Sequence, residues 1–191
     1  MAAVSPVHMT AAMQFYVGGV IAGGAAILIA FAPREIPDPG LAAGFLAAMV
    51  VVSLFKQRLP LWPGESTVTM AYGVDCAVML TAGVDLAMAI AAVGVVVQCL
   101  ARVRRPQQWH RTAFSVATVV LGVQAAGWVW SHLGGGATDA HVVTMILPLV
   151  PAGAAYVAIN AGLVAVAITL SYRASSSRIS ARSTSSAPAT T

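Results

Sequence analysis

Charged residues are scarce in this chain, and their scarcity decides the fold class. Only 8% of the 191 residues are Asp, Glu, Lys or Arg, whereas 59% are hydrophobic. Soluble domains contain about 25% charged residues, and a water-soluble core in a chain of this length could not hide so much apolar surface. We therefore expect an all-α, polytopic membrane domain in which lipid solvates the apolar surface, with no second folded domain.

Cysteine is rare too, and the usual catalytic motifs are absent. Cys76 and Cys99 lie inside apolar runs, where small packing residues are a simpler interpretation than a disulfide or a metal pair. The four histidines have no metal-ligand spacing, and the sequence contains no nucleophile elbow, P-loop, HExxH motif or paired carboxylates. The sequence therefore predicts no enzymatic activity, no cofactor and no metal site.

The net charge of +4 does not indicate nucleic-acid binding. The basic residues form short clusters between apolar runs, and no basic stripe carries interleaved aromatic side chains. Such clusters are typical of the cytoplasmic lipid surface, so the lipid bilayer is the expected partner. The predicted anchors there are Lys56, Arg58, Arg102, Arg104, Arg105 and Arg111, with Trp62 and Trp109 at the interface.

Six apolar runs follow an N-terminal segment of residues 1–10. They cover about 11–32, 41–55, 67–82, 84–101, 112–133 and 143–172. Because about 20 apolar residues cross the hydrocarbon core as a helix, we expect about six transmembrane helices. Pro148 and Pro151 predict a kink in the last run. Residues 173–191 are rich in Ser, Ala and Thr, and we expect them to form a disordered cytoplasmic tail.

The stretch 67–102 is too long for one span. Gly83 supplies a natural turn within it, and Asp85 is placed to act as the N-cap of the helix that follows. The stretch fits either two short spans or one re-entrant hairpin, and both interpretations stay open.

The distribution of basic residues predicts the orientation of the domain. If the N-terminus is inside and each run crosses once, every Lys and Arg of the ten in the chain except Arg34 falls on the cytoplasmic side. This bias is the positive-inside pattern, so we expect both termini in the cytoplasm and the domain in the cytoplasmic (inner) membrane. The acids expected outside are Glu35, Asp38, Asp85 and Asp139.

Asp75 is the acid that lies deepest in an apolar run. It is about nine residues from either end of its predicted helix, which places it near mid-bilayer at about 1.5 Å per residue. A carboxylate there costs about 2.5–3.5 kcal/mol on insertion scales, so it should face the bundle and have a partner. Tyr72, one turn earlier, lies on the same helix face. Asp75 is therefore either a ligand, cation or proton site or a hydrogen-bonded carboxyl that fixes helix packing.

Two further polar residues lie at a similar depth. Gln124 and Asn160 are each about twelve residues from the cytoplasmic end of their predicted spans, by counting at about 1.5 Å per residue. Together with Asp75 and Tyr72 they predict either a ligand pocket between helices or a polar network that stabilises the bundle. Gln98 lies about one turn from Arg102, and we expect it to reach the membrane interface.

Small residues repeat at the spacing used for close helix packing in membranes. A small-residue face on the first predicted span is formed by Gly18, Gly19, Gly23 and Gly24, with a GxxxG pair at Gly19 and Gly23, and Gly40 and Gly44 repeat the spacing on the second. We expect these glycines to pack helices within one chain, with packing between two chains of a homo-oligomer as the alternative.

Several motifs resemble the N-terminal membrane domain of bacterial cyclic-di-GMP signalling proteins, which precedes an HD-GYP phosphodiesterase or GGDEF cyclase module. The matching motifs, within residues 50–172, are Phe55-Lys56-Gln57-Arg58-Leu59-Pro60-Leu61, Ser66-Thr67-Val68-Thr69, Tyr72-Gly73-Val74-Asp75, Gln98-Cys99, Arg111-Thr112-Ala113-Phe114-Ser115, Val123-Gln124-Ala125-Ala126-Gly127, Leu147-Pro148-Leu149 and Tyr156-Val157-Ala158-Ile159-Asn160. The resemblance implies a sensory or anchoring input domain. The HD and GGDEF residues are missing after Tyr172, so we expect this chain neither to make nor to cleave a cyclic dinucleotide.

The sequence thus predicts a membrane sensory or anchoring domain that relays a signal to a cytoplasmic partner. The alternative is a small-solute transporter or a substrate-binding membrane subunit, which the mid-membrane Asp75 and the prolines of the last run also fit. A third interpretation is a structural membrane protein without a ligand.

Overall fold

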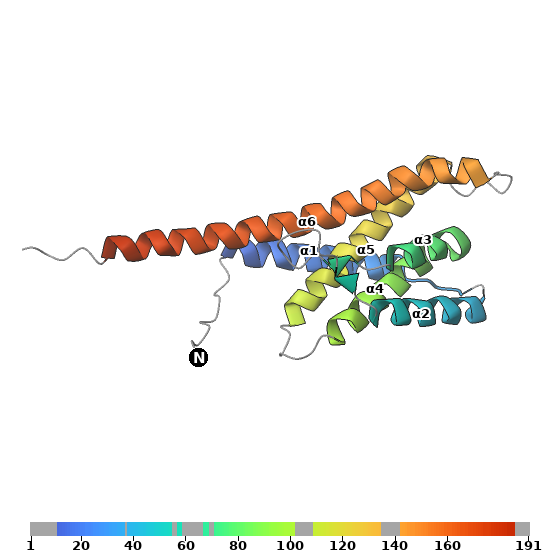
Figure 1. The fold of residues 1–191 in the computed structure, drawn as a ribbon, viewed down its shortest axis with the longest axis horizontal. Coiled ribbons are helices and arrows are strands. Elements are labelled where there is room, and N and C mark those ends of the chain that lie inside the picture. The colour runs from blue at the N-terminus through green and yellow to red at the C-terminus, as the bar shows by residue number, and fades with distance from the viewer. Residues whose placement is uncertain are drawn as a thin grey trace, which may run out of the picture.

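The computed structural model describes residues 11–36, 38–54, 57–58, 67–68, 71–101, 109–134 and 142–185. Its helices are α1 (Ala11–Ala30), α2 (Pro39–Leu54), α3 (Ala71–Ala82), α4 (Val84–Leu100), α5 (Trp109–His132) and α6 (Val142–Ser185), as Figure 1 shows. A two-residue antiparallel pair, β1 (Gln57–Arg58) and β2 (Thr67–Val68), lies between α2 and α3 in the sequence. The predicted all-α fold class is confirmed.

Three of the helices are long and apolar enough to cross a membrane: α1, α5 and the Leu147–Tyr172 part of α6. These helices indicate a membrane protein, but the prediction of about six full spans is wrong. Helices α2, α3 and α4 contain 16, 12 and 17 residues. At about 1.5 Å per residue, α3 is only about 18 Å long, against about 30 Å of hydrocarbon. Counting apolar residues overestimated the number of spans, because apolar composition does not determine where a helix begins and ends.

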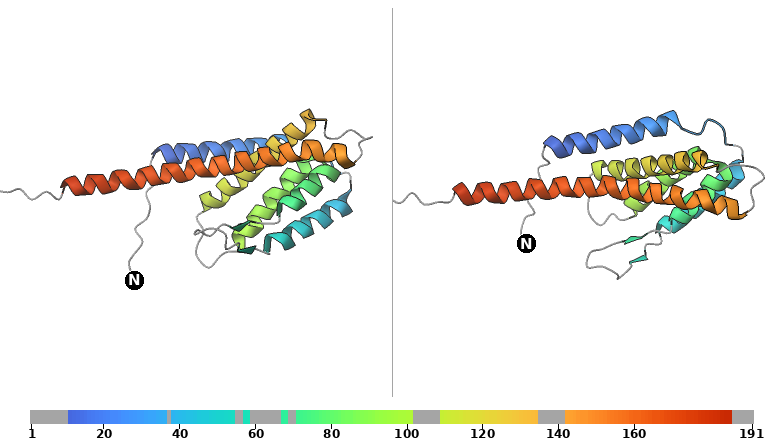
Figure 2. Two further views of the ribbon diagram at one scale, coloured as in Figure 1. Left: turned by 45° about the horizontal axis from the view of Figure 1, so that its top comes forward. Right: turned by 90° about the horizontal axis from the view of Figure 1, so that it is seen from above.

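A single glycine separates α3 from α4. Gly83 has a φ of +90°, a backbone conformation that side-chain-bearing residues rarely adopt, so the turn needs glycine. The two helices pack against each other as a hairpin (Figure 2). The turn is at the predicted place, but Asp85 lies in the first turn of α4 and is not the N-cap; Gly83 holds that position and no side chain caps it.

Helix α5 lies at the centre of the bundle. It packs against α1, α4 and α6, while α4 also packs against α2 and α3 (Figures 1 and 2). The side chains of Val78, Ala87, Met88 and Val120 are completely buried between these helices. Many large apolar side chains instead point outward from α1, α5 and α6, as expected of helices whose outer faces contact lipid.

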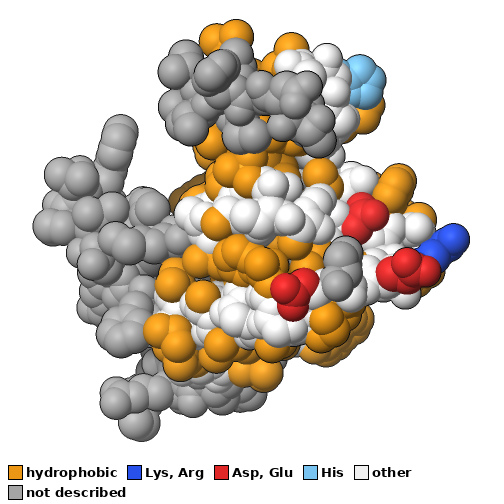
Figure 3. Space-filling model, turned by 90° about the vertical axis from the view of Figure 1, so that its right-hand side faces the viewer, with side chains coloured by type: hydrophobic (Ala, Val, Ile, Leu, Met, Phe, Trp, Pro, Cys, Tyr) orange, Lys and Arg blue, Asp and Glu red, His pale blue; other side chains and the backbone are white. Residues whose placement is uncertain are grey.

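The two ends of the bundle differ in charge. At one end, the chain after α1 lies beside the α3–α4 turn, and Arg34, Glu35, Gly83 and Asp85 line one hollow there. Figure 3 views this end and shows acidic side chains with a basic one at the edge. Helices α1 and α5 begin at the opposite end, where the span of α6 ends (Figure 1). Of the charged residues predicted to lie outside the cell, Arg34, Glu35 and Asp85 are therefore found at the same end of the bundle.

Helix α6 is much longer than the predicted sixth span. It is continuous from Val142 to Ser185, through Pro148 and Pro151, and its first turns bend away from the direction of the rest (Figure 1). The expectation that the whole tail is disordered is wrong for residues 173–185, which are helical. They contain neither Gly nor Pro, and extending an existing helix avoids the cost of nucleating a new one. Residues 186–191 lie outside the described part of the chain.

The closest helix contacts occur at glycines outside the predicted GxxxG pairs, one of them Gly24 of the predicted small-residue face. A Cβ on Gly19, Gly23 or Gly44 would have no atom of the described chain within 4 Å, and one on Gly40 would meet only the Asp38 carboxylate, at 3.3 Å. These GxxxG pairs therefore do not form helix contacts within the described chain. A contact between two chains stays a prediction.

Helices approach closely at Gly24, Gly94 and Gly127, the last of these where a Cβ on α5 would clash with the Val84 side chain of α4. A Cβ on Gly24 would lie 2.6 Å from the Cβ of Ala117, so only glycine lets α1 approach the backbone of α5. A Cβ on Gly94 would lie 2.6 Å from Cγ of Met49, where α4 meets α2.

Candidate functional site

Asp75 is the only charged side chain that is buried among the described residues whose side chains are placed. It is 8% exposed, and its Oδ1 has no hydrogen-bond partner in the described chain. The next turn of α3 explains its direction, because Val78 and Met79 lie three and four residues later and are buried in the core. Asp75 therefore belongs to the face that α3 presents to the rest of the bundle.

The position of Asp75 along the bundle follows from its place in α3 and from its neighbours. It lies four residues after the start of α3 at Ala71 and seven before the end at Ala82, close to the middle of this short helix. It shares the wall of one cavity with Ala91 of α4 and Tyr156 of α6, and that wall continues to Gln98 and Ser53, near the ends of α4 and α2. The predicted mid-bilayer depth of Asp75 stays a prediction.

A cavity of about 440 Å³ lies beside Asp75, which we call the larger cavity. Helices α2 to α6 all contribute to its wall. Its polar side chains are Ser53, Tyr72, Asp75, Gln98, Ser115, Thr118, Tyr156 and Asn160. Apart from the carboxylate these groups are neutral hydroxyls and amides. The volume falls within the range of pockets that bind small organic molecules.

A second cavity of about 250 Å³, the smaller cavity, adjoins the same residues. Tyr72, Asp75 and Tyr156 line both cavities. The remaining wall of the smaller cavity is formed by Cys76, Met79, Val123, Ala126, Gly153 and Val157. Asp75 therefore stands where a polar cavity meets an apolar one.

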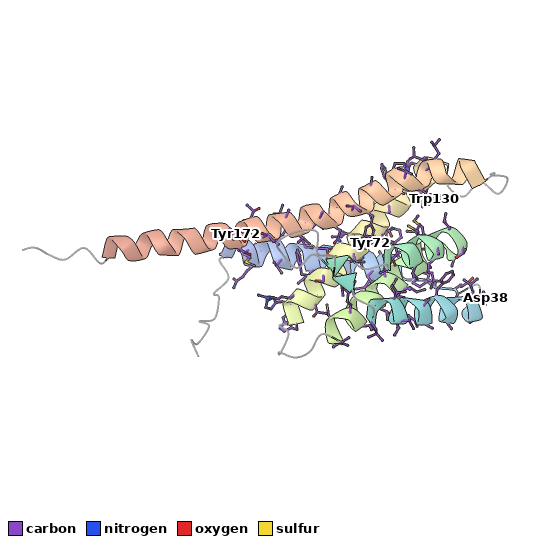
Figure 4. All side chains as sticks on the ribbon, in the orientation of Figure 1. Asp38, Tyr72, Trp130 and Tyr172 are labelled. Carbon is purple, nitrogen blue, oxygen red and sulfur yellow. The ribbon has the colours of Figure 1, made fainter. Side chains whose placement is uncertain are left out.

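Two tyrosines flank the carboxylate. The rings of Tyr72 on α3 and Tyr156 on α6 meet edge to face, with centroids 4.8 Å apart and an interplanar angle of 82°. Figure 4 shows Tyr72 in the middle of the molecule, where α3 faces α6. Tyr156 is buried, whereas Tyr72 is partly exposed. This pair joins the short hairpin to the long last helix.

The structure brings together most of the predicted ligand residues. Tyr72, Asp75 and Asn160 line the larger cavity, and Gln124 lines neither cavity, although its buried Oε1 also has no partner in the described chain. Gln98, expected at the interface, instead lines the larger cavity.

Tyr156 was missed as a site residue. It lies one helical turn before Asn160, and this spacing could have indicated that the two share a helix face. Ser53 and Thr118 were also missed. A hydroxyl in an apolar helix can donate a hydrogen bond to a carbonyl of the same helix, so its presence in the sequence does not indicate a site. Thr118 donates such a bond to the carbonyl of Ser115 at 3.0 Å.

Most of the predicted lipid anchors cannot be placed. Lys56, Trp62, Arg102, Arg104 and Arg105 lie outside the described residues, and only the backbone of Arg58 is described, in β1. Trp109 and Arg111 are exposed in the first turn of α5. Their position agrees with an interfacial role at that end of the bundle.

The described cavity lining offers one carboxylate as its charged group. Among the described residues, no Lys, Arg or His lines either cavity, and no three His, Cys, Asp or Glu residues gather as metal ligands. A single carboxylate with a free oxygen can accept hydrogen bonds from a ligand or balance a positive charge. Comparisons of the chain with protein-family models, with curated proteins and with solved structures give no match.

Proposed function

We propose that this chain is a sensory domain of the bacterial inner membrane, which binds a small molecule between its helices and transmits the bound state through α6. The observation that carries the proposal is the double role of α6. This helix supplies Tyr156 and Asn160 to the larger cavity and then continues without interruption to Ser185. A ligand in the cavity would therefore touch the same rigid element that leaves the bundle.

The packing of α6 gives it a second contact that a ligand could change. Helix α6 lies against α5 and α1, and the Tyr16 hydroxyl donates a hydrogen bond of 2.8 Å to the Leu163 carbonyl. Leu163 follows Asn160 by three residues, so both groups lie on neighbouring turns. Packed helices shift between discrete arrangements more readily than they deform, so a movement at Asn160 would be carried toward Ser185.

The orientation and the partner complete the proposal. Both termini lie in the cytoplasm according to the positive-inside pattern, so the extended end of α6 would meet a cytoplasmic signalling protein. The resemblance of the sequence to cyclic-di-GMP input domains supplies the class of that partner: a GGDEF or HD-GYP module.

The alternative function, a small-solute transporter or substrate-binding membrane subunit, has one structural feature in its favour. Pro148 and Pro151 lie within α6 close to Tyr156, and prolines near a binding site let a helix bend during transport. Uptake of a solute by proteoliposomes that contain the chain would favour this alternative.

The relay can be tested with a neutral variant of the cavity acid. We expect Asp75→Asn to change the intracellular cyclic-di-GMP level in cells that carry the whole chain, whereas Asp85→Asn should not. Asp85 is a matched control because it is exposed and lines neither cavity. Unchanged cyclic di-GMP in both variants, together with a pull-down that recovers no GGDEF or HD-GYP protein, would overturn the relay.

A further inference from the structure

The surroundings of Asp75 restrict the charge of any molecule that enters the cavities. Its carboxylate is 8% exposed, lines both cavities, and has an Oδ1 without a hydrogen-bond partner in the described chain. The described lining residues include no cation that could balance it. In a region of low dielectric this carboxylate attracts a cationic ligand and repels an anionic one.

The two tyrosines indicate that the cation is organic. Tyr rings bind ammonium groups through their electron-rich faces, and Tyr72 and Tyr156 both stand beside Asp75. A divalent metal would instead need several oxygen ligands, usually more than one carboxylate. The described residues offer one carboxylate and no three-residue metal-ligand group. An ammonium ion fits this set better than a metal ion.

The smaller cavity indicates what the ammonium group is attached to. Its wall beyond the shared residues is mainly apolar, with Met79, Val123 and Ala126 among its side chains. Its volume is about 250 Å³, and an apolar cavity of about 150 Å³ is large enough to bind benzene. One aromatic ring or a short alkyl chain therefore fits it.

We propose that the site binds a small amphiphilic amine. Its ammonium group pairs with Asp75 beside Tyr72 and Tyr156, its aryl or alkyl group enters the smaller cavity, and any polar substituent lies toward Asn160 in the larger cavity. This inference rests on the proposed ligand-binding function and names the ligand class of the same site.

The test uses the full chain in lipid nanodiscs and three probes of matched shape. These probes are 2-phenylethylamine, the neutral 2-phenylethanol and the anionic phenylacetate, each titrated by calorimetry against loaded and protein-free discs. The protein-free discs correct for partitioning of the probes into lipid. We expect saturable binding of the amine, weaker by about tenfold or more in Asp75→Asn and unchanged in Asp85→Asn.

The possible outcomes separate the ligand class from the relay. If the alcohol or the acid binds the wild-type chain as tightly as the amine does, the amine proposal is overturned while ligand binding stands. If the amine does not bind saturably, or binds Asp75→Asn as well as the wild type, the proposal is likewise overturned. The comparison of the three probes on the wild-type chain needs no variant, so a misfolded Asp75→Asn would not obscure the result. The relay is tested independently by the cyclic-di-GMP level.

Discussion

Tyr72 and Tyr156 hold the α3–α4 hairpin to α6 through an edge-to-face contact of 4.8 Å between their ring centroids. The contact joins residues that are far apart in sequence and that both line the two cavities. Tyr156 is buried whereas Tyr72 is partly exposed, so truncating Tyr156 would remove more buried surface from the bundle than truncating Tyr72.

Removing the Tyr156 ring should therefore destabilise the bundle. We expect Tyr156→Ala to lower the free energy of unfolding by about 3 kcal/mol, since both the buried ring and the aromatic pair are lost. Tyr156→Phe keeps the ring and should change stability little. Thermal unfolding in detergent, followed by circular dichroism, measures both. Tyr172→Ala is the control because Tyr172 is 74% exposed; an equal loss in this variant would contradict the prediction.

The contact of α1 with α5 should depend on one glycine. In Gly24→Ala the new Cβ would meet the Ala117 Cβ at 2.6 Å, so the helices must separate, and we expect a loss of about 1–3 kcal/mol. Gly23→Ala, where a Cβ has nothing within 4 Å in the described chain, should leave the unfolding transition unchanged. If Gly24→Ala and Gly23→Ala unfolded at the same temperature, the close approach of α1 to α5 at Gly24 would be contradicted.

We expect Asp75 to lower the free energy of unfolding of the bundle, although it is needed for ligand binding. Burying a carboxyl oxygen without a partner costs about 1–3 kcal/mol, so Asp75→Leu should raise the free energy of unfolding by a similar amount and abolish amine binding. Equilibrium unfolding and calorimetric titration of the same preparation test both effects. A less stable Asp75→Leu would instead indicate a carboxyl that fixes helix packing, the structural interpretation that the sequence leaves open.

The topology predicts which engineered cysteines a membrane-impermeant thiol reagent can reach. In a chain with Cys76 and Cys99 replaced by Ser, Asp85→Cys should react from outside intact spheroplasts and Trp109→Cys only after lysis. Both positions are exposed and lie at opposite ends of the bundle. The reverse pattern would show that the basic end faces outward, and it would contradict the proposal that the extended end of α6 lies in the cytoplasm.

The sequence predicted composition-driven features well and helix lengths poorly. Membrane character, the turn at Gly83 and the shared cavity of Tyr72, Asp75 and Asn160 followed from apolar runs, from glycine and from helical spacing. The short α3 did not, because the residues before Ala71 are nearly as apolar as the helix itself. Hydropathy carries no signal for the place where such a run becomes helical.

The long α6 and the role of Tyr156 were missed for different reasons. Low hydrophobicity after Tyr172 is typical of disorder, although the absence of Gly and Pro in residues 173–185 permits helix continuation. An aromatic residue in an apolar span is usually a packing residue, and only the position of α3 opposite Tyr156 makes it part of the site. The role of Tyr156 depends on a tertiary contact that no single segment encodes, whereas the length of α6 depends on a local preference that hydropathy does not report.

The direction of the larger cavity indicates from which side a molecule could reach Asp75. From the level of Asp75 the cavity wall continues along α4 to Gln98 and along α6 to Val164, toward the basic end, whereas toward the Gly83 turn it stops on α4 at Ala91. With the basic end in the cytoplasm, as proposed, the shortest route to the carboxylate is from the cell interior. The domain would then report the internal pool of its ligand, so a change in metabolism would act on it sooner than a change in the medium.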